Sequence, residues 1–379
     1  MSALTIINRH YPPNPGITGE SAWDLAKYLI EQHGIQVVIV CVDRSDDGGG
    51  HSREPIGDVY TIKTVYRGRN GFLRLISGFL DGFLLMRKAS QVGKGPFLVM
   101  TSPPLLPFWA ALMLRKTGFW LWSMDLFPEG FAAESKISPT NPVYRWIIRQ
   151  TYRHAPQRLI ALGPMQAAHV RAKYNRPDLP THILPCGVLM HQHRDLNRPE
   201  WRPDDGKIYL GYAGNIGAAH SVAFLQSFLQ HLDCKRFRLV LALYGPHANQ
   251  LIQEATGREG VILLPNIPRS QLNWLDWQLV SLRPEWTHIA VPSKAVSAIC
   301  AGSPIVFCGS AESDTYALLQ GAIVLVDAEQ TDIDAQVATV LQTLTPALLA
   351  EKKQVAEILA VRLQQKVDKT YQELATIAV

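Results

Sequence analysis

The sequence predicts an α/β protein built from two αβα domains in tandem. Short β-branched runs, such as IQVVIVCV at residues 35–42, alternate with segments of helical spacing, a pattern typical of parallel sheets covered by helices. A polar, proline-containing segment at residues 189–206 interrupts this alternation and is predicted to be a linker. The alternation then restarts, and each half opens with a strand, a glycine-containing loop and a helix.

The composition narrows the class of protein. A chain of 379 residues holds two to three domains at roughly 150 residues each, and 47% apolar content excludes disorder as the main state. The net charge of +5 suits an anionic ligand or an acidic membrane surface, but it is too small to indicate nucleic acid. Five scattered cysteines without a CxxC pair fit a reducing compartment, and the N-terminus lacks a signal-peptide pattern.

The first half is predicted to contain alternating strands and helices. An uncharged stretch at 97–114 holds three prolines, so it is predicted to be a strand, a loop and a helix from about Pro107 rather than a membrane span. Gly34 should end the first helix in a left-handed conformation. The predicted strands are 4–8, 35–42, 97–102, 119–127, 157–163 and 181–188, and the predicted helices are 20–34, 142–153 and 164–174.

The second half is predicted to follow the same design and to end in a helix from Pro346 to about Ala378. Asp332 and Asp334 lie two positions apart in the order Asp-x-Asp, but they stand at the start of a helical pattern, so capping explains them better than metal binding. The predicted strands are 207–217, 237–245, 260–268, 277–284, 303–309 and 322–327, and a helix is predicted at 220–232.

Several familiar motifs are absent from the sequence: GxxxxGK[ST], HExxH, GxSxG and a full GxGxxG. Their absence weakens assignments to P-loop hydrolases, zincins, α/β-hydrolases and dehydrogenases. The remaining candidates for a functional site are glycine-containing loops and charged residues near the ends of predicted strands.

Two glycine-containing loops are candidates for phosphate contact. Gly16 and Gly19 lie between the first strand and its helix, where they indicate either close approach to a ligand phosphate or a plain turn. The loop that contains Gly214, Asn215 and Gly217 is denser and favours phosphate binding by backbone N–H groups at a helix start.

Charged residues near predicted strand ends form a second group of candidates. Arg283 and Lys294 could neutralise a diphosphate, or they could be ordinary surface cations. Asp125 and Glu129 follow an apolar strand, where acids tend to face the ligand crevice of an α/β fold, although a helix-capping role explains Asp125 equally well.

A set of motifs resembles family 4 glycosyltransferases of the GT-B fold, in the subgroup that builds bacterial capsular, exopolysaccharide or O-antigen repeat units. The motifs span nearly the whole chain in order: NRHYPPNPGITGESAWDLAKYL, TSPPLL, MDLFPEG, LPCGV, YAGNIG, LYGP, LPNIPRSQL, SLRPE and VPSK…AGSPIV. Each is modest alone, and together they are specific for the fold and superfamily rather than for the sugar.

The resemblance implies two Rossmann-like domains facing a cleft. The N-terminal domain, residues 1–188, would bind the acceptor, and the C-terminal domain, residues 207–357, would bind a nucleotide-sugar. The C-terminal helix, about 358–379, would return to the first domain, and residues 189–206 would be the linker between the domains.

The resemblance also implies the site. Asp125 and Glu129 would be catalytic. Relatives often carry His where this chain has Met124, and a ribose-binding Glu where it has Ser297. The residues that would bind the donor are Gly16, Gly19, Gly214, Asn215, Gly217, Gly245, Ile267, Arg283, Glu285, Ser293, Lys294 and Ser297.

The expected function is that of a retaining glycosyltransferase in surface polysaccharide synthesis. It would transfer a hexosyl or N-acetylhexosaminyl group from a nucleotide-diphosphate sugar to a saccharide acceptor that is expected to be lipid-linked. The resemblance implies a cytoplasmic protein that needs no metal and binds no nucleic acid. Two alternatives stay open: a GT-B epimerase that acts on the nucleotide-sugar itself, and a non-catalytic sugar-nucleotide-binding protein.

The segment 72–88 is predicted to form an amphipathic helix that could dock on the anionic inner face of the membrane. Arg67 and Arg69 precede it and would add positive charge. The alternative is a helix that packs its apolar face on the first sheet. The expected apolar face is Phe72, Leu75, Ile76, Phe79, Leu80 and Phe83, and the expected polar face is Arg74, Ser77, Gly78 and Asp81.

Overall fold

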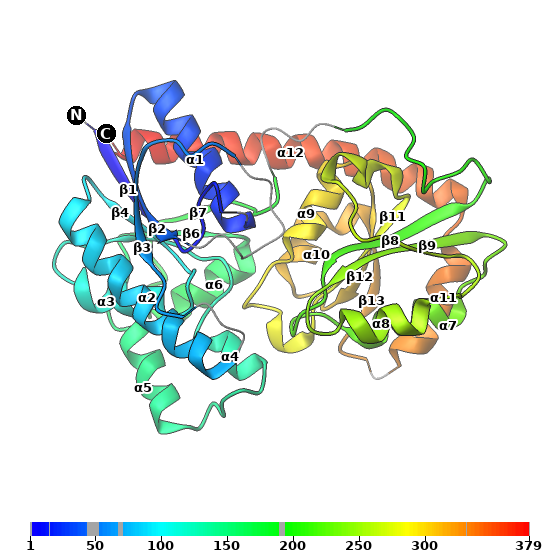
Figure 1. The fold of residues 1–379 in the computed structure, drawn as a ribbon, viewed down its shortest axis with the longest axis horizontal. Helices are drawn as coiled ribbons and strands as arrows, with labels where there is room; N and C mark the ends of the chain where they lie inside the picture. Colours follow the sequence, from blue (N-terminus) through cyan, green and yellow to red (C-terminus); the bar gives the residue numbers. More distant parts are fainter. Residues whose placement is uncertain are drawn as a thin grey trace. The chain divides into compact units, whose positions relative to one another are not determined.

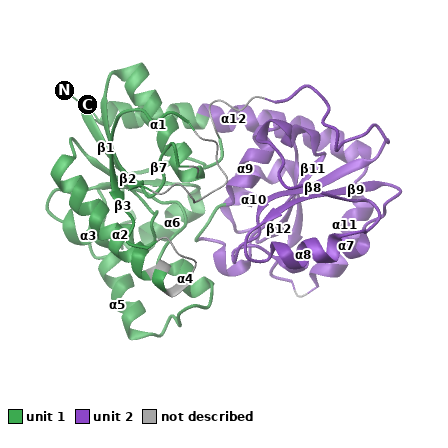
Figure 2. Ribbon diagram, viewed as in Figure 1, with its two compact units in different colours: residues 1–189, 289–291, 366–379 green, residues 190–288, 292–365 purple. Residues whose placement is uncertain are grey.

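The computed structural model describes residues 2–14, 16–43, 53–66, 71–188, 194–330 and 332–378, without the side chains of residues 71, 72, 74 and 75. The chain forms two compact units (Figure 2). Unit 1 comprises residues 1–189, 289–291 and 366–379, and unit 2 comprises residues 190–288 and 292–365. The last helix is therefore shared between them.

Unit 1 is a parallel sheet with helices packed against it (Figure 1). The strands lie in the order β3-β2-β1-β4-β5-β6-β7. The chain therefore adds strands on one side of β1 and then on the other, as in a doubly wound fold. Its strands are β1 (Ala3–Ile7), β2 (Gln36–Asp43), β3 (Asp58–Lys63), β4 (Phe97–Met100), β5 (Trp120–Trp122), β6 (Arg158–Ala161) and β7 (Thr181–Ile183). Its helices are α1 (Ile17–His33), α2 (Gly71–Val92), α3 (Leu106–Met113), α4 (Glu129–Ala133), α5 (Pro142–Thr151) and α6 (Pro164–Lys173).

Unit 2 repeats this design with the strand order β10-β9-β8-β11-β12-β13, again all parallel. Its strands are β8 (Ile208–Asn215), β9 (Phe237–Tyr244), β10 (Val261–Leu263), β11 (Trp277–Ser281), β12 (Ile305–Gly309) and β13 (Ile323–Asp327). Its helices are α7 (Val222–His231), α8 (Ala248–Ala255), α9 (Ser293–Cys300), α10 (Asp314–Leu319) and α11 (Ile333–Thr343), with 3-10 turns η1 (Arg269–Trp274), η2 (Pro284–Trp286) and η3 (Gln320–Ala322).

The central strands form because their side chains are apolar on both faces. Every residue of β1 and β12 is buried, as expected for strands covered by helices on both sides. β3 was not predicted from the sequence. It lies at the sheet edge, and its exposed and half-buried residues do not make the continuous apolar run that marks the central strands.

Helix ends follow the local sequence signals. Gly34 closes α1 at φ 62°, in the left-handed conformation predicted for it. Asp332 caps α11, because its carboxylate accepts a hydrogen bond from the backbone N–H of Ala335 at 2.8 Å. Capping thus accounts for the first acid of the Asp-x-Asp pair, and the second, Asp334, contacts His231 at 2.8 Å.

The helix α12 (Pro346–Ala378) matches the predicted C-terminal helix and belongs to both units. In its unit 2 part, Lys353 forms an ion pair with Asp276 at 2.7 Å. In its unit 1 part, Thr370 donates a hydrogen bond to the carbonyl of Ile183 at 3.2 Å. The helix continues without a break at residue 357, where the sequence placed the end of the second domain.

The described part of the predicted linker, residues 194–206, is grouped with unit 2. Arg202 forms an ion pair with Asp276 at 3.0 Å and donates to the carbonyl of Trp274 at 2.7 Å. The polar composition of this segment suggested a linker without tertiary contacts. In the structure, its arginine Arg202 bonds residues of unit 2.

The packing of α2 differs from the alternative in which its whole apolar face lies on the sheet. Ser77 and Asp81, expected on the polar face, are buried. Asp81 accepts hydrogen bonds from the Thr64 hydroxyl at 2.8 Å and the Val65 N–H at 3.1 Å, so the polar side chains satisfy backbone and hydroxyl groups beyond β3. As a result Ile76 and Leu80 are exposed.

Other parts of that prediction cannot be placed. Arg67, Arg69 and the side chains of Phe72, Arg74 and Leu75 lie outside the described residues. In the described part of the chain, no helix is long and apolar enough to cross a membrane.

Candidate functional site

The carboxyl ends of three neighbouring strands meet at one edge of the unit 2 sheet. β8 pairs with β9 on one side and with β11 on the other, and β8 is the strand at which the chain order reverses. Loops at such a switch point form the usual ligand crevice of an open α/β sheet. The loop after β8 contacts the loop after β11, since the Arg283 N–H donates to the carbonyl of Ala219 at 2.9 Å.

Lys294 lies at this edge, in the first turn of α9. Its Nζ donates to the Tyr212 hydroxyl at 2.5 Å and to the Asn215 carbonyl at 3.0 Å. The same nitrogen lies 4.0 Å from the centre of the Tyr212 ring, a cation–π distance. The half-buried position lowers the pKa of Lys294 to about 7.

The glycines of this edge allow close approach of the backbone. Gly214 adopts φ 130°, and a Cβ there would lie 3.8 Å from the Nζ of Lys294. Gly245, after β9, adopts φ 103°, and a Cβ there would overlap Oδ1 of Asn215. A Cβ on Gly217 would lie 3.1 Å from Nδ2 of Asn215. The three predicted glycines therefore surround the Asn215 side chain and the Lys294 ammonium.

Arg283 follows β11 and approaches the same loop. Its guanidinium lies 3.3 Å from Glu285 and 3.5 Å from the carbonyl of Ala218. Both Arg283 and Glu285 are solvent-accessible, so the ion pair between them is weak and can exchange for a ligand anion.

Three other predicted donor residues differ in their exposure. Ile267 is buried with Tyr209 and Leu272 in an apolar cluster, so only its backbone could meet a ligand. Ser293 opens α9 and is half-buried, and Ser297, one turn later, is buried. The predictions for these positions are not tested by the structure.

His220 was missed in the sequence, although it stands between the glycine loop and α7. Its Nδ1 lies 2.7 Å from the Ser281 carbonyl, so Nδ1 donates and Nε2 keeps its lone pair. Burial, followed by the charge of Lys294, lowers the pKa of His220 to about 3. The ring is therefore neutral and fixes the loop after β8 to the end of β11. A His that directly follows a glycine loop was the available signal.

In unit 1, Asp125 lies beyond the end of β5 and is exposed. Its neighbours are fixed: the Met124 N–H donates to the Thr101 hydroxyl at 2.9 Å, and the Leu126 N–H donates to the Ile289 carbonyl at 2.9 Å. Desolvation by the surrounding protein, followed by the charge of Glu134, raises the pKa of Asp125 to about 6, although the residue is exposed at the surface.

Glu129, predicted as a catalytic partner of Asp125, has a different environment. It is buried in the first turn of α4. Burial raises the pKa of Glu129, and the nearby tyrosines Tyr144, Tyr152 and Tyr174 all interact electrostatically with its carboxylate. The two acids are thus an exposed and a buried group, and they cannot be treated as an equivalent pair.

The first glycine loop has a structural explanation. A Cβ on Gly19 would lie 2.9 Å from the backbone carbon of His10, and one on Gly16 would lie 3.1 Å from the His10 ring. Both glycines therefore let α1 begin close to the chain that leaves β1. Within the described residues, no group of three or more His, Cys, Asp or Glu side chains could hold a metal ion.

No family model matches the sequence, and no curated protein gives a significant match. Solved structures do match over the full length, at low identity. The chain is similar to a sucrose-phosphate synthase from Thermosynechococcus elongatus, with a TM-score of 0.71, 13% identity, and coverage of 100% of this chain and 98% of the other.

Two further structures show the same relationship. WaaG, a glycosyltransferase involved in lipopolysaccharide biosynthesis, matches with a TM-score of 0.67 and 13% identity, covering 99% of each chain. A trehalose-6-phosphate synthase used to study glycosyl transfer with retention matches with a TM-score of 0.64 and 11% identity, covering 99% of this chain and 98% of the other. The chain therefore has the GT-B fold, with two Rossmann-like domains that each hold a parallel sheet.

Proposed function

We propose that this protein is a glycosyltransferase that takes a sugar from a nucleotide-diphosphate donor bound by unit 2. The observation that carries the proposal is the position of Lys294 against the Gly214 loop, at the switch point of the sheet. Of the three donors of its ammonium, two have acceptors in the described part of the chain. The remaining donor is available to a phosphate oxygen.

The chemistry follows from these groups. Transfer breaks the bond between the anomeric carbon and the diphosphate oxygen, so negative charge develops on the leaving diphosphate. Lys294, Arg283 and the N–H groups around the glycine loop stabilise that charge without reorganising. We expect these cations to replace a metal ion in this role.

Asp125 is assigned to the acceptor. An exposed carboxylate with a pKa raised to about 6 can orient an acceptor hydroxyl and accept its hydrogen bond near neutral pH. Glu129 is assigned a supporting role, because its carboxylate is buried.

The finer features of the proposal have support from the resemblance and from the similar structures. Retention of configuration is supported by the trehalose-6-phosphate synthase studied for that mechanism. A role in surface polysaccharide synthesis is supported by the similarity to WaaG, a glycosyltransferase involved in lipopolysaccharide biosynthesis. A hexosyl or N-acetylhexosaminyl donor and a lipid-linked acceptor are supported by the family resemblance of the motifs. Membership of the family 4 subgroup is part of the same proposal.

Attachment to the cytoplasmic face of a membrane is supported by exposed apolar side chains on neighbouring helices. Ile76 and Leu80 of α2 are 41% and 38% exposed. Trp146 of α5 is 53% exposed and connects to α2 through Phe108, which contacts both Trp146 and Phe79. Such side chains beside arginines are typical of proteins that bind anionic lipid surfaces.

A panel of UDP-, GDP- and dTDP-sugars in a thermal-shift assay tests the donor site, because a ligand that binds only the native state raises its stability. The stabilising sugar nucleotide is then incubated alone. Slow hydrolysis supports a transferase, an epimerised nucleotide-sugar would identify the alternative epimerase, and binding without turnover even with acceptor saccharides would identify a non-catalytic binding protein.

A further inference from the structure

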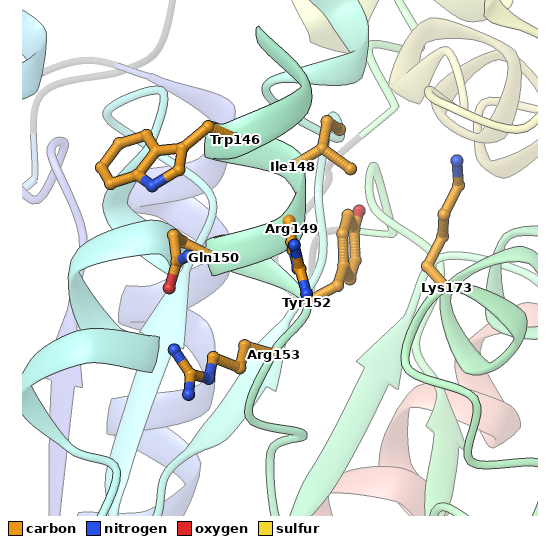
Figure 3. A pocket seen from close by; sticks show the side chains of 7 residues that line it. All are labelled: Trp146, Ile148, Arg149, Gln150, Tyr152, Arg153 and Lys173. Carbon is orange, nitrogen blue, oxygen red and sulfur yellow. The ribbon is translucent and has the colours of Figure 1, made fainter. Parts of the chain in front are cut away.

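A cavity of about 740 Å³ lies in unit 1 around the carboxyl-terminal half of α5 and the end of α6. Its lining includes Trp146, Ile148, Arg149, Tyr152, Arg153 and Lys173. Figure 3 shows Lys173 on the neighbouring helix, across Tyr152 from Arg149. The cavity belongs neither to the switch point of unit 2 nor to the segment that holds Asp125.

The charge of the cavity is positive. Arg149, Arg153 and Lys173 are exposed, and none of them forms an ion pair with any residue that the structure describes. Arg149 lies in the last turn of α5 and Arg153 lies two residues after its end, and both side chains line the cavity. α5 carries no acidic residue.

One acid, Glu129, interacts electrostatically with Tyr152 and Lys173. Glu129 is 6% exposed, and burial raises its pKa and favours the neutral form. The cavity therefore presents three cations to solvent, and the carboxylate of Glu129 does not line it.

An apolar surface borders these cations. Trp146 is 53% exposed, with its ring centre 5.6 Å from that of Phe108. Val143, one turn earlier on the same helix, is 61% exposed. A ligand seated on the cations would thus place an attached hydrocarbon chain against exposed apolar side chains.

We infer that this cavity binds the phosphorylated head group of an amphiphilic ligand, a lipid phosphate or diphosphate. Arg149, Arg153 and Lys173 neutralise the phosphate, and Trp146 and Ile148 contact the chain that it carries. That this lipid is the acceptor of the transfer reaction rests on the proposed function. That the cavity binds a lipid phosphate does not depend on the proposed function.

The test measures the binding of two probes by isothermal titration calorimetry on the full chain. Geranyl diphosphate carries a diphosphate on a hydrocarbon chain, and inorganic pyrophosphate carries the charge alone. We expect the wild type to bind geranyl diphosphate at least tenfold more tightly than pyrophosphate. The Arg149→Gln/Arg153→Gln variant should lose about tenfold or more in affinity for both probes, since each charge-assisted contact contributes strongly.

Three controls make the result specific. Arg145→Gln removes a cation from the same helix outside the cavity and should leave both affinities unchanged. Trp146→Ala should reduce the affinity for geranyl diphosphate and leave the affinity for pyrophosphate unchanged. Binding of the nucleotide-sugar should be unaffected by Arg149→Gln/Arg153→Gln, and Lys294→Met should show the reverse pattern, so failure of this inference and failure of the proposed function are distinguishable.

Equal affinity of the wild type and Arg149→Gln/Arg153→Gln for geranyl diphosphate would overturn the inference. A lower melting temperature without a change in affinity would assign these arginines to stabilising the end of α5 instead. Equal affinity of the wild type for the two probes would show a site for free phosphate and overturn the assignment to a lipid.

Discussion

The ammonium of Lys294 lies 2.5 Å from the hydroxyl of Tyr212 and 4.0 Å from the centre of the same ring. Tyr212 is fully buried, and its hydroxyl donates to the Asn215 carbonyl at 2.9 Å. The tyrosine therefore holds the lysine through both its oxygen and its ring, beside the glycine loop of the proposed donor site.

Loss of the two cations of unit 2 should weaken donor binding. We expect Lys294→Ala and Arg283→Ala each to cost on the order of 1.5–3 kcal/mol in nucleotide-sugar binding, the range for hydrogen bonds to charged groups. Isothermal titration calorimetry measures the effect. Lys207→Ala is a suitable control, since Lys207 lies just before β8 and donates to the carbonyl of Cys234, just before β9, and not to the loop after β8. Unchanged nucleotide-sugar affinity in both variants would show that the donor does not bind at the carboxyl edge of the unit 2 sheet.

Donor affinity should fall as the pH rises from about 6 to 8.5. The pKa of Lys294 is lowered to about 7, so the free protein loses this positive charge above neutrality and must take up a proton to bind the diphosphate. The decline should approach about tenfold per pH unit at the alkaline end. His220, with a pKa of about 3, does not titrate in this window.

The variant Lys294→Arg tests this origin, because a guanidinium keeps its charge throughout the range. Its affinity should vary much less with pH. A decline equally steep in this variant would assign the titration to another group.

Asp125→Asn should abolish or strongly lower transfer while nucleotide-sugar affinity stays nearly unchanged. The expected loss is about 10²–10⁴-fold in kcat if the carboxylate acts as a general base. The comparison variant is Asp58→Asn, at the exposed edge strand β3. Full activity of Asp125→Asn would show that the carboxylate is not needed for transfer and that Asp125 has a structural role in the loop after β5.

Two glycine substitutions in helices should have opposite effects on stability. Gly19→Ala would place a Cβ 2.9 Å from the backbone of His10 and should destabilise unit 1 by about 1–3 kcal/mol. Gly78→Ala meets no atom within 4 Å and should stabilise α2 by about 0.5–1 kcal/mol. Urea unfolding midpoints compare the two, and a stabilising Gly19→Ala would contradict the close packing of α1 on the loop after β1.

The wild type should sediment with phosphatidylglycerol vesicles at low salt, and less at high salt. Ile76→Glu/Leu80→Glu should abolish this association, because it places two acids on the exposed side of α2. Ile358→Glu/Val361→Glu changes two exposed apolar residues of α12 in unit 2, at 53% and 59% exposure, and should leave it intact. Equal loss in both variants would indicate a general effect of charge instead of a surface on α2.

The fold was largely predictable because burial on both faces leaves a strong record in the sequence. β2, β9 and β12 are continuous apolar runs, and such runs have few alternatives in an α/β chain. β3 left no such record, since an edge strand needs little apolar surface.

The site was less predictable, because it depends on contacts between distant segments. The loop glycines and Lys294 could be named from local patterns, and their approach to one another required the strand order. Tyr212 resembles an ordinary core tyrosine in the sequence, and nothing local predicts that its hydroxyl meets Lys294 from 82 positions away. Burial of the polar face of α2 could not be predicted, because hydrophobic periodicity does not register the Val65 backbone N–H whose hydrogen bond Asp81 accepts.

The helix α12 has a consequence for the order in which the protein matures during synthesis. Tyr371, Leu374 and Ala375 are buried in unit 1, and the Tyr371 ring packs 5.5 Å from that of Tyr28. Unit 2 ends at residue 365, so its chain is finished while unit 1, whose first strand was made long before, still lacks part of its core. The unit that is synthesised first is the one that is completed last, and a nascent chain stopped before residue 366 would lack the buried side chains of Tyr371, Leu374 and Ala375.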